Sequence, residues 1–126
     1  MAGFYASQFR LPDGSGLVSP RMMPIRIDGS DLPNGTATTA GVDVGAGWCV
    51  ARDDGANLVT ITFNESVRQA PMVYASVSTA NAVVDVITTS TTGITYTTVE
   101  NDDTTSAVAD ADVDLFLLFF DTADVT

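Results

Sequence analysis

The chain of 126 residues contains no histidine, no lysine and one cysteine, Cys49. Histidine is the usual general base near neutral pH and the commonest metal ligand, so its absence removes most catalytic triads and most transition-metal sites. Without lysine the chain forms neither a Schiff base nor the phosphate contact of a P-loop. A single cysteine allows no intramolecular disulfide and no structural zinc site.

Positive charge is also scarce. Five arginines stand against 16 acidic residues, which gives a net charge of −11. A surface of this sign does not neutralise phosphates, so the composition argues against nucleic-acid binding and against binding to anionic membranes. The longest apolar run covers residues 115–120 and is far too short to span a bilayer. No hydrophobic signal segment follows Met1, which argues against export.

The sequence does contain repeated segments of alternating polarity. Four of them are "LVTITF" (58–63), "MVYASVS" (72–78), "AVVDVIT" (82–88) and "GITYTTV" (93–99). Their β-branched and aromatic residues suit a pleated, half-buried surface. Turn segments such as "RDDGAN" and "TTSTTG" separate them. This spacing predicts an all-β fold, an antiparallel β-sandwich of jelly-roll-like type.

The length predicts one domain with two unlike segments. Residues 46–126 should form the sandwich. Residues 1–45 hold four of the five prolines and several turn dipeptides. Pro24, within "RMMPIRI", favours an edge strand or an extended arm. Two interpretations of this segment stay open: a loop-rich N-terminal arm that packs on the sandwich or on a neighbouring subunit, or ordinary edge strands of the same domain.

The segment "DADVDLFLLFF" (110–120) has two different faces if it is a strand. Asp110, Asp112 and Asp114 would point to one side, and the other side would carry only apolar residues: Val113, Leu115, Leu117 and Phe119. The segment lacks the glycine and glutamate of an EF-hand loop. We therefore expect a solvated face opposite a core face and no bound metal. A Ca²⁺ site that these aspartates share with a neighbouring loop is the alternative.

The aspartate-bearing face turns apolar towards the end of this segment and needs a cover, either the arm or another subunit. Two apolar clusters, one in each segment of the chain, supply the residues for such a contact. The predicted interface set is Met22, Met23, Ile25, Phe116, Leu118 and Phe120.

Other candidate sites have simpler interpretations. The aspartates of "DDG" (53–55) and "NDD" (101–103) fit turn chemistry. Asp85 is expected to point outwards or to pair with arginine rather than to act as a catalytic carboxylate. Trp48 is expected in the core rather than as a platform for a sugar ring. No constellation supports catalysis, so we expect a protein that is not an enzyme and needs no cofactor.

The segment "VTITFNESVRQAPMVYASVS" (59–78) resembles the small β-sandwich modules of tailed-bacteriophage virion proteins. A strand ends at Phe63, a polar segment follows, and Ala70-Pro71 leads into a second apolar strand. The resemblance covers about residues 47–120. Its pattern is shared by tail appendages, sugar-binding modules and capsid decoration (cement) proteins. A single domain without a fibre or repeat, together with a Gly/Pro-rich arm, favours the decoration type.

The resemblance implies a structural virion protein that binds the major capsid protein at capsomer junctions and stabilises the head. It implies synthesis in the host cytoplasm, a position on the capsid surface and a homotrimer, with a dimer as the alternative. It implies no catalytic residues. The alternative function is a tail or receptor-binding module that recognises carbohydrate. Exposure of Trp48 or Tyr74 beside loop aspartates would favour that alternative, and their burial would count against it.

Overall fold

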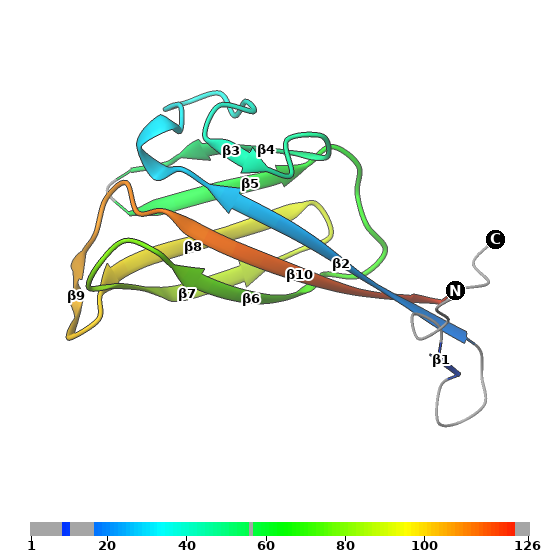
Figure 1. Ribbon diagram of the computed structural model, residues 1–126. Coiled ribbons are helices and arrows are strands. Elements are labelled where there is room, and N and C mark those ends of the chain that lie inside the picture. The colour runs from blue at the N-terminus through cyan, green and yellow to red at the C-terminus, as the bar shows by residue number, and fades with distance from the viewer. Residues whose placement is uncertain (1–8, 11–16, 56, 123–126) are drawn as a thin grey trace.

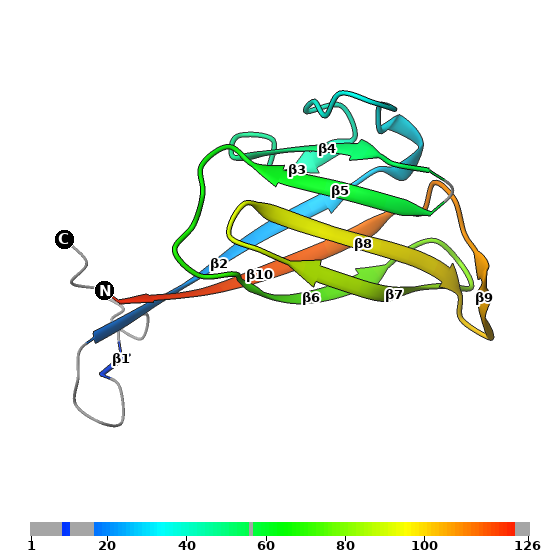
Figure 2. The same cartoon turned by 180° about the vertical axis from the view of Figure 1, so that it is seen from behind.

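The chain folds into two antiparallel sheets that pack face to face (Figure 1 and Figure 2). The computed structural model describes residues 9–10, 17–55 and 57–122, with side chains for residues 21–55 and 57–119. These residues contain one short 3-10 helix, Gly29–Asp31, and no α-helix. No helix among the described residues is long and apolar enough to cross a membrane. The predicted all-β antiparallel sandwich is confirmed.

The first sheet is built around its two longest strands, β2 and β10. Its strands follow the order β1-β2-β10-β6, and β3 pairs with the end of β2. Their bounds are Phe9–Arg10 for β1, Leu17–Ile27 for β2, Val42–Val44 for β3, Met72–Val77 for β6 and Val113–Thr122 for β10.

The second sheet contains most of the strands that the alternating pattern predicted. Its strands follow the order β4-β5-β8-β7, and β9 pairs with the end of β8. Their bounds are Cys49–Asp53 for β4, Leu58–Phe63 for β5, Ala82–Thr89 for β7, Gly93–Glu100 for β8 and Asp103–Ala107 for β9.

The core lies between the two sheets and follows the two-residue alternation of each strand. On β10 the predicted inward residues Val113, Leu115, Leu117 and Phe119 are at most 3% exposed, which confirms the predicted core face. The first sheet adds Ile25 and Ile27 from β2. The facing side chains of the second sheet are Cys49, Ala51, Val59, Ile61, Phe63, Ile94 and Tyr96.

The start of β10 corrects one expectation. Asp110 and Asp112 do not lie on the strand with Asp114, because the strand begins at Val113. Asp110 instead occupies a turn with a left-handed backbone (φ 58°), a conformation that aspartate tolerates better than most residues. The three aspartates therefore do not form one row.

The predicted boundary at residues 45 and 46 falls between β3 and β4, inside the sandwich. Residues 17–44 contribute β2 and β3 to the first sheet. Pro24 lacks a backbone N–H, but it fits within β2 because its nitrogen lies on the side of the strand away from β10. A Cβ on Gly45, the residue after β3, would be 3.2 Å from the Pro24 carbonyl oxygen. The polar backbone atoms of Pro24 therefore face β3 and not β10. No hydrogen bond of the β2–β10 ladder is lost there.

The β2–β10 ladder is longer than the sheet around it. It runs from Val113 opposite Ile27 to Thr122 opposite Val18, whereas β6 pairs with β10 only as far as Leu118. Figure 1 and Figure 2 show the two strands continuing past the sandwich body as a ribbon. Residues 1–8 and 11–16 of the predicted arm lie outside the described residues.

Shortening a side chain to alanine should lower stability more on the inner face of β10 than on its outer face. We expect Leu117→Ala to lower the free energy of unfolding by about 2–5 kcal/mol, because it leaves a cavity in a fully buried site. Leu118→Ala, on the opposite face of the same strand, should cost about 1 kcal/mol or less. Urea unfolding followed by circular dichroism measures both. Equal losses for the two variants would contradict the assignment of the faces.

The buried thiol of Cys49 should make stability fall at alkaline pH. Burial raises the pKa of this thiol to about 11 from an ordinary value of 9.0. The folded state therefore holds the thiol proton more tightly, and this contribution is lost as pH rises from 9 towards 11. Burial, helped by the Asp112 charge, also raises the pKa of Tyr96, which adds to the loss at the upper end.

The Cys49→Ala variant isolates the thiol contribution. Between pH 9 and 11 the wild-type protein should lose about 2–3 kcal/mol of unfolding free energy more than Cys49→Ala does. Urea titrations of both proteins at pH 8, 9, 10 and 11 give the difference. Parallel curves across that range would show that the thiol does not titrate differently in the folded state.

Candidate functional site

On the outer face of the first sheet, apolar side chains of three neighbouring strands lie side by side in two rows. Register places Leu118 of β10 between Met22 of β2 and Met72 of β6. The next row places Phe116 between Pro24 and Tyr74. Residues directly opposite in neighbouring strands lie close enough for their side chains to touch. These six residues, here called the outer patch, are Met22, Pro24, Met72, Tyr74, Phe116 and Leu118.

The outer patch is open to solvent in the single chain. Met22 is 63% exposed, Tyr74 61%, Met72 54% and Phe116 47%, whereas Leu118 is half-buried between its neighbours. Scattered apolar residues on a surface are ordinary, but a contiguous apolar group on one sheet face indicates a contact site. Within the described residues nothing covers this group.

A polar row closes the outer patch at one side. Asp114 stands between Arg26 and Ser76. The Arg26 guanidinium donates two hydrogen bonds to the Asp114 carboxylate, at 2.8 and 3.3 Å. This hydrogen bonding, with the Asp114 charge, raises the pKa of Arg26. The carboxylate next to the apolar rows is therefore neutralised by a forked ion pair.

The structure brings together only part of the predicted interface set. Met22, Phe116 and Leu118 meet in the outer patch. Met23 and Ile25 are corrections, because the alternation of β2 turns both inwards; Ile25 is 1% exposed and lies in the core. The backbone of Phe120 pairs with Pro20, and its side chain lies outside the described residues.

Three members of the outer patch were missed by the sequence prediction. The alternation in "MVYASVS" already placed Met72 and Tyr74 on one face. It could not show that β6 would be the neighbour of β10, because that pairing joins segments about 40 residues apart. From the sequence, Pro24 favours an edge strand or an extended arm and is not among the predicted contact residues.

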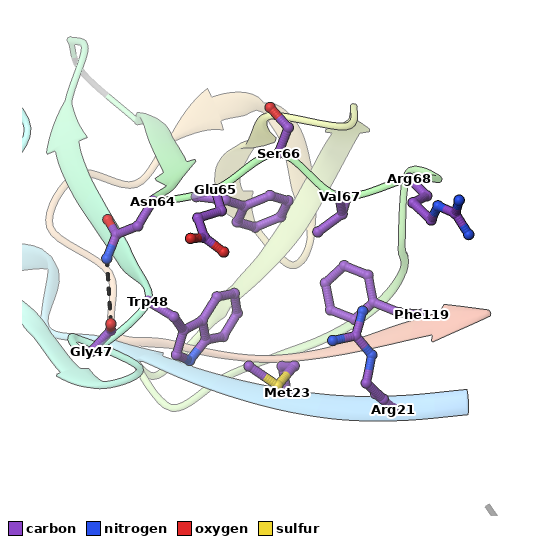
Figure 3. Close-up of a pocket in the computed structure, with 11 residues that line it drawn as sticks. Arg21, Met23, Gly47, Trp48, Asn64, Glu65, Ser66, Val67, Arg68 and Phe119 are labelled. Atoms are coloured by element: carbon purple, nitrogen blue, oxygen red, sulfur yellow. Dashed lines mark hydrogen bonds between the residues drawn. The ribbon is translucent and has the colours of Figure 1, made fainter. Parts of the chain in front are cut away.

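A second surface feature is a cleft at one end of the sandwich, here called the end cleft (Figure 3). It has a volume of about 700 Å³. Its floor is aromatic: the Trp48 and Phe63 ring centroids are 5.7 Å apart, and those of Phe63 and Phe119 are 6.1 Å apart. Two strands of the first sheet and the connection from β5 to β6 form its walls. The lining residues are Arg21, Met23, Gly47, Trp48, Phe63, Asn64, Glu65, Ser66, Val67, Arg68 and Phe119.

The rim of the end cleft is polar, and hydrogen bonds between neighbouring segments fix its position. The Asn64 side-chain amide donates to the Gly47 carbonyl oxygen at 3.3 Å, and the Asn64 backbone N–H donates to the Trp48 carbonyl at 2.9 Å. The Arg21 guanidinium lies 5.4 Å from the Phe119 ring centroid, within cation–π range. Trp48, expected in the core, is half-buried: it packs on the core and also lines the cleft.

The aspartates of the turns are held by local hydrogen bonds. Asp54 accepts from Thr60 and Arg52, and these bonds, led by that from Thr60, lower the pKa of Asp54. Asp103 accepts from the hydroxyls of Thr105 and Ser106, which lowers its pKa in the same way. Each carboxylate thus ties its own turn together.

The aspartates weighed for Ca²⁺ have separate surroundings. Asp112 accepts a hydrogen bond from the Gly29 backbone N–H at 3.1 Å, Asp114 binds Arg26, and Asp110 occupies the turn before β10. In the described part of the chain, no three carboxylate, cysteine or histidine side chains are grouped as metal ligands would be.

Metal removal should therefore leave the protein unchanged. We expect EDTA to leave the melting temperature of the protein where it is in buffer alone, because Asp114 is paired with Arg26 and Asp112 accepts a hydrogen bond from Gly29. Thermal unfolding followed by circular dichroism, with and without added Ca²⁺, tests this. A large fall in EDTA that Ca²⁺ reverses would show that Asp110, Asp112 and Asp114 do take part in a site.

Comparison with known proteins adds no relative to these observations. No protein-family model matches the chain, and no curated protein or solved structure is significantly similar to it. The two surfaces described above, the outer patch and the end cleft, are therefore the basis on which function is inferred.

Proposed function

We propose that the chain is a structural virion protein of the capsid decoration type, which acts by binding and not by catalysis. It is made in the host cytoplasm, associates with itself through the outer patch, and binds the major capsid protein on the capsid surface at capsomer junctions. The observation that carries the proposal is an uncharged apolar patch on one sheet face of a chain with a net charge of −11.

The distribution of charge favours the outer patch as the place where copies of the chain meet. Two molecules of −11 repel each other wherever their carboxylates face. The outer patch carries no charged side chain, and the nearest carboxylate, Asp114, is paired with Arg26. Two copies that meet there bury apolar area without bringing unpaired charges together.

The size of the outer patch suits the centre of such an interface. Stable protein interfaces bury about 800 Å² on each partner, with an apolar centre and a polar rim. Six adjacent side chains that include Phe116, Tyr74 and two methionines provide that centre, since aromatic residues and methionine are enriched there. The Arg26–Asp114 pair lies at its rim.

Most soluble homo-oligomers have closed symmetry, so self-association through the outer patch is expected to give a closed oligomer. The resemblance to decoration proteins favours a trimer at local three-fold axes. The alternative dimer would pair the outer patch with its own copy across a two-fold axis. In either form each subunit adds its own contact to the shell, and the combined attachment is stronger than any one contact.

The acidic surface and the chemistry of the chain agree with this role. A protein of −11 is repelled by packaged DNA, which suits a position on the outside of a capsid. Histidine, which most often acts as a general base, and lysine, which forms Schiff bases, are absent from the sequence.

Phe116→Ser tests the proposal with a matched control. Phe116 is 47% exposed on the first sheet, and Val86 is 51% exposed on the second. Phe116→Ser should shift the protein towards monomer and reduce its occupancy on capsids, while Val86→Ser leaves both unchanged. Analytical ultracentrifugation gives the oligomeric state, and cosedimentation with undecorated capsids gives occupancy. Leu118→Ser, in the neighbouring row of the outer patch, should behave like Phe116→Ser.

The two parts of the proposal fail in different ways. If Phe116→Ser and Leu118→Ser assemble like the parent, the outer patch is not the interface between copies. If the parent protein forms a closed oligomer that does not sediment with capsids, the decoration role is wrong although the interface stands.

A further inference from the structure

The end cleft offers a flat aromatic surface beside polar groups. Trp48 is half-buried, so part of its indole remains open to the cleft, while the more deeply buried Phe63 and Phe119 support it from the core. In Figure 3, Glu65 points from the β5–β6 connection towards Trp48, the Arg21 guanidinium lies beside Phe119, and Arg68 points away. The edge of a ligand that lies on the indole would be within reach of the Glu65 carboxylate.

The charges of the lining select among ligand classes. A purely apolar ligand would take the Glu65 carboxylate out of water without giving it a partner, which is unfavourable. An anionic ligand would meet Glu65, and a cationic one would meet Arg21. A neutral ligand with many hydroxyl groups avoids each of these conflicts, because hydroxyls donate to a carboxylate and accept from a guanidinium.

We infer that the end cleft is a binding site for a neutral oligosaccharide. A pyranose ring has an apolar C–H face and hydroxyl groups around its edge. The C–H face packs on the Trp48 indole, and the ring hydroxyls donate to Glu65 and accept from Arg21. The cleft volume of about 700 Å³ lies within the range of about 300–1,000 Å³ that is usual for small-ligand sites.

The site binds its saccharide without cleaving it. Hydrolysis of a glycosidic bond needs a pair of carboxyl groups about 5–9.5 Å apart, one on each side of the bond. Glu65 is the single acidic residue among those that line the cleft in the described part of the chain. The cleft and the outer patch use opposite faces of β2 and β10, so saccharide binding is an activity separate from self-association.

Trp48 provides a direct readout, because it is the only tryptophan in the sequence. Its fluorescence is titrated with cellotriose, chitotriose and maltotriose, each up to about 10 mM, a range that detects millimolar affinity. At least one of the three should give a saturable change in emission. The absence of a saturable change with all three overturns the inference.

Two glutamates make a matched pair of variants, since the sequence contains only Glu65 and Glu100. Both are exposed, and Glu100 lies at the β8–β9 turn, away from the cleft. Glu65→Ala should weaken the saccharide affinity about tenfold or more, because it removes a hydrogen bond to a charged group. Glu100→Ala should leave it unchanged. Equal affinity in Glu65→Ala and the parent overturns the inference.

Two further measurements distinguish saccharide binding from a protein contact at the same cleft. Phe116→Ser, which disrupts the outer patch, should bind saccharide like the parent, so the cleft is tested independently of self-association. Acrylamide quenching of Trp48 is compared for free and capsid-bound protein. If capsids shield Trp48 and none of the three saccharides binds, the cleft is a protein contact and the saccharide assignment is wrong.

Discussion

The register between β2 and β10 is the constraint on which the rest of the structure depends. Leu115 pairs with Ile25 and Leu117 with Met23, so the inward residues of both strands meet in the core. The side-chain period of a strand is two, and a slip of one residue would turn every side chain of the slipped strand to the other face. Such a slip of β10 would place Asp114 in the core without Arg26, at a cost that a domain of ordinary stability does not tolerate.

The same register produces both surfaces from neighbouring residues. Met22 points to the outer patch and Met23 to the end cleft; Leu118 belongs to the outer patch and Phe119 to the cleft. The cleft forms where the β5–β6 connection, rather than another strand, covers the inner face of this ladder (Figure 1 and Figure 3). Side chains on opposite faces of a strand can therefore serve self-association and ligand binding separately.

The sequence predicted what local periodicity determines and missed what long-range pairing determines. The inward face of β10 follows from alternation within one segment, and so does the inward face of β5. The proline in "RMMPIRI" obscured β2, because its compatibility depends on which side of the strand its nitrogen occupies. That Tyr74 neighbours Phe116, and that Trp48 reaches the cleft with Phe119, depends on strand order, which no short motif encodes.

The placement of arginine connects the acidic composition with the two surfaces. The structure describes the side chains of four arginines, and only Arg52, which binds Asp54 within a turn, is distant from both surfaces. Arg26 neutralises Asp114 beside the outer patch, and Arg21 and Arg68 line the end cleft. A net charge of −11 keeps molecules apart in general, but repulsion is weakest where carboxylates are balanced or absent. The scarce positive charge thus lies where contact with another molecule is proposed, and the excess negative charge covers the remaining surface, where it opposes unspecific association.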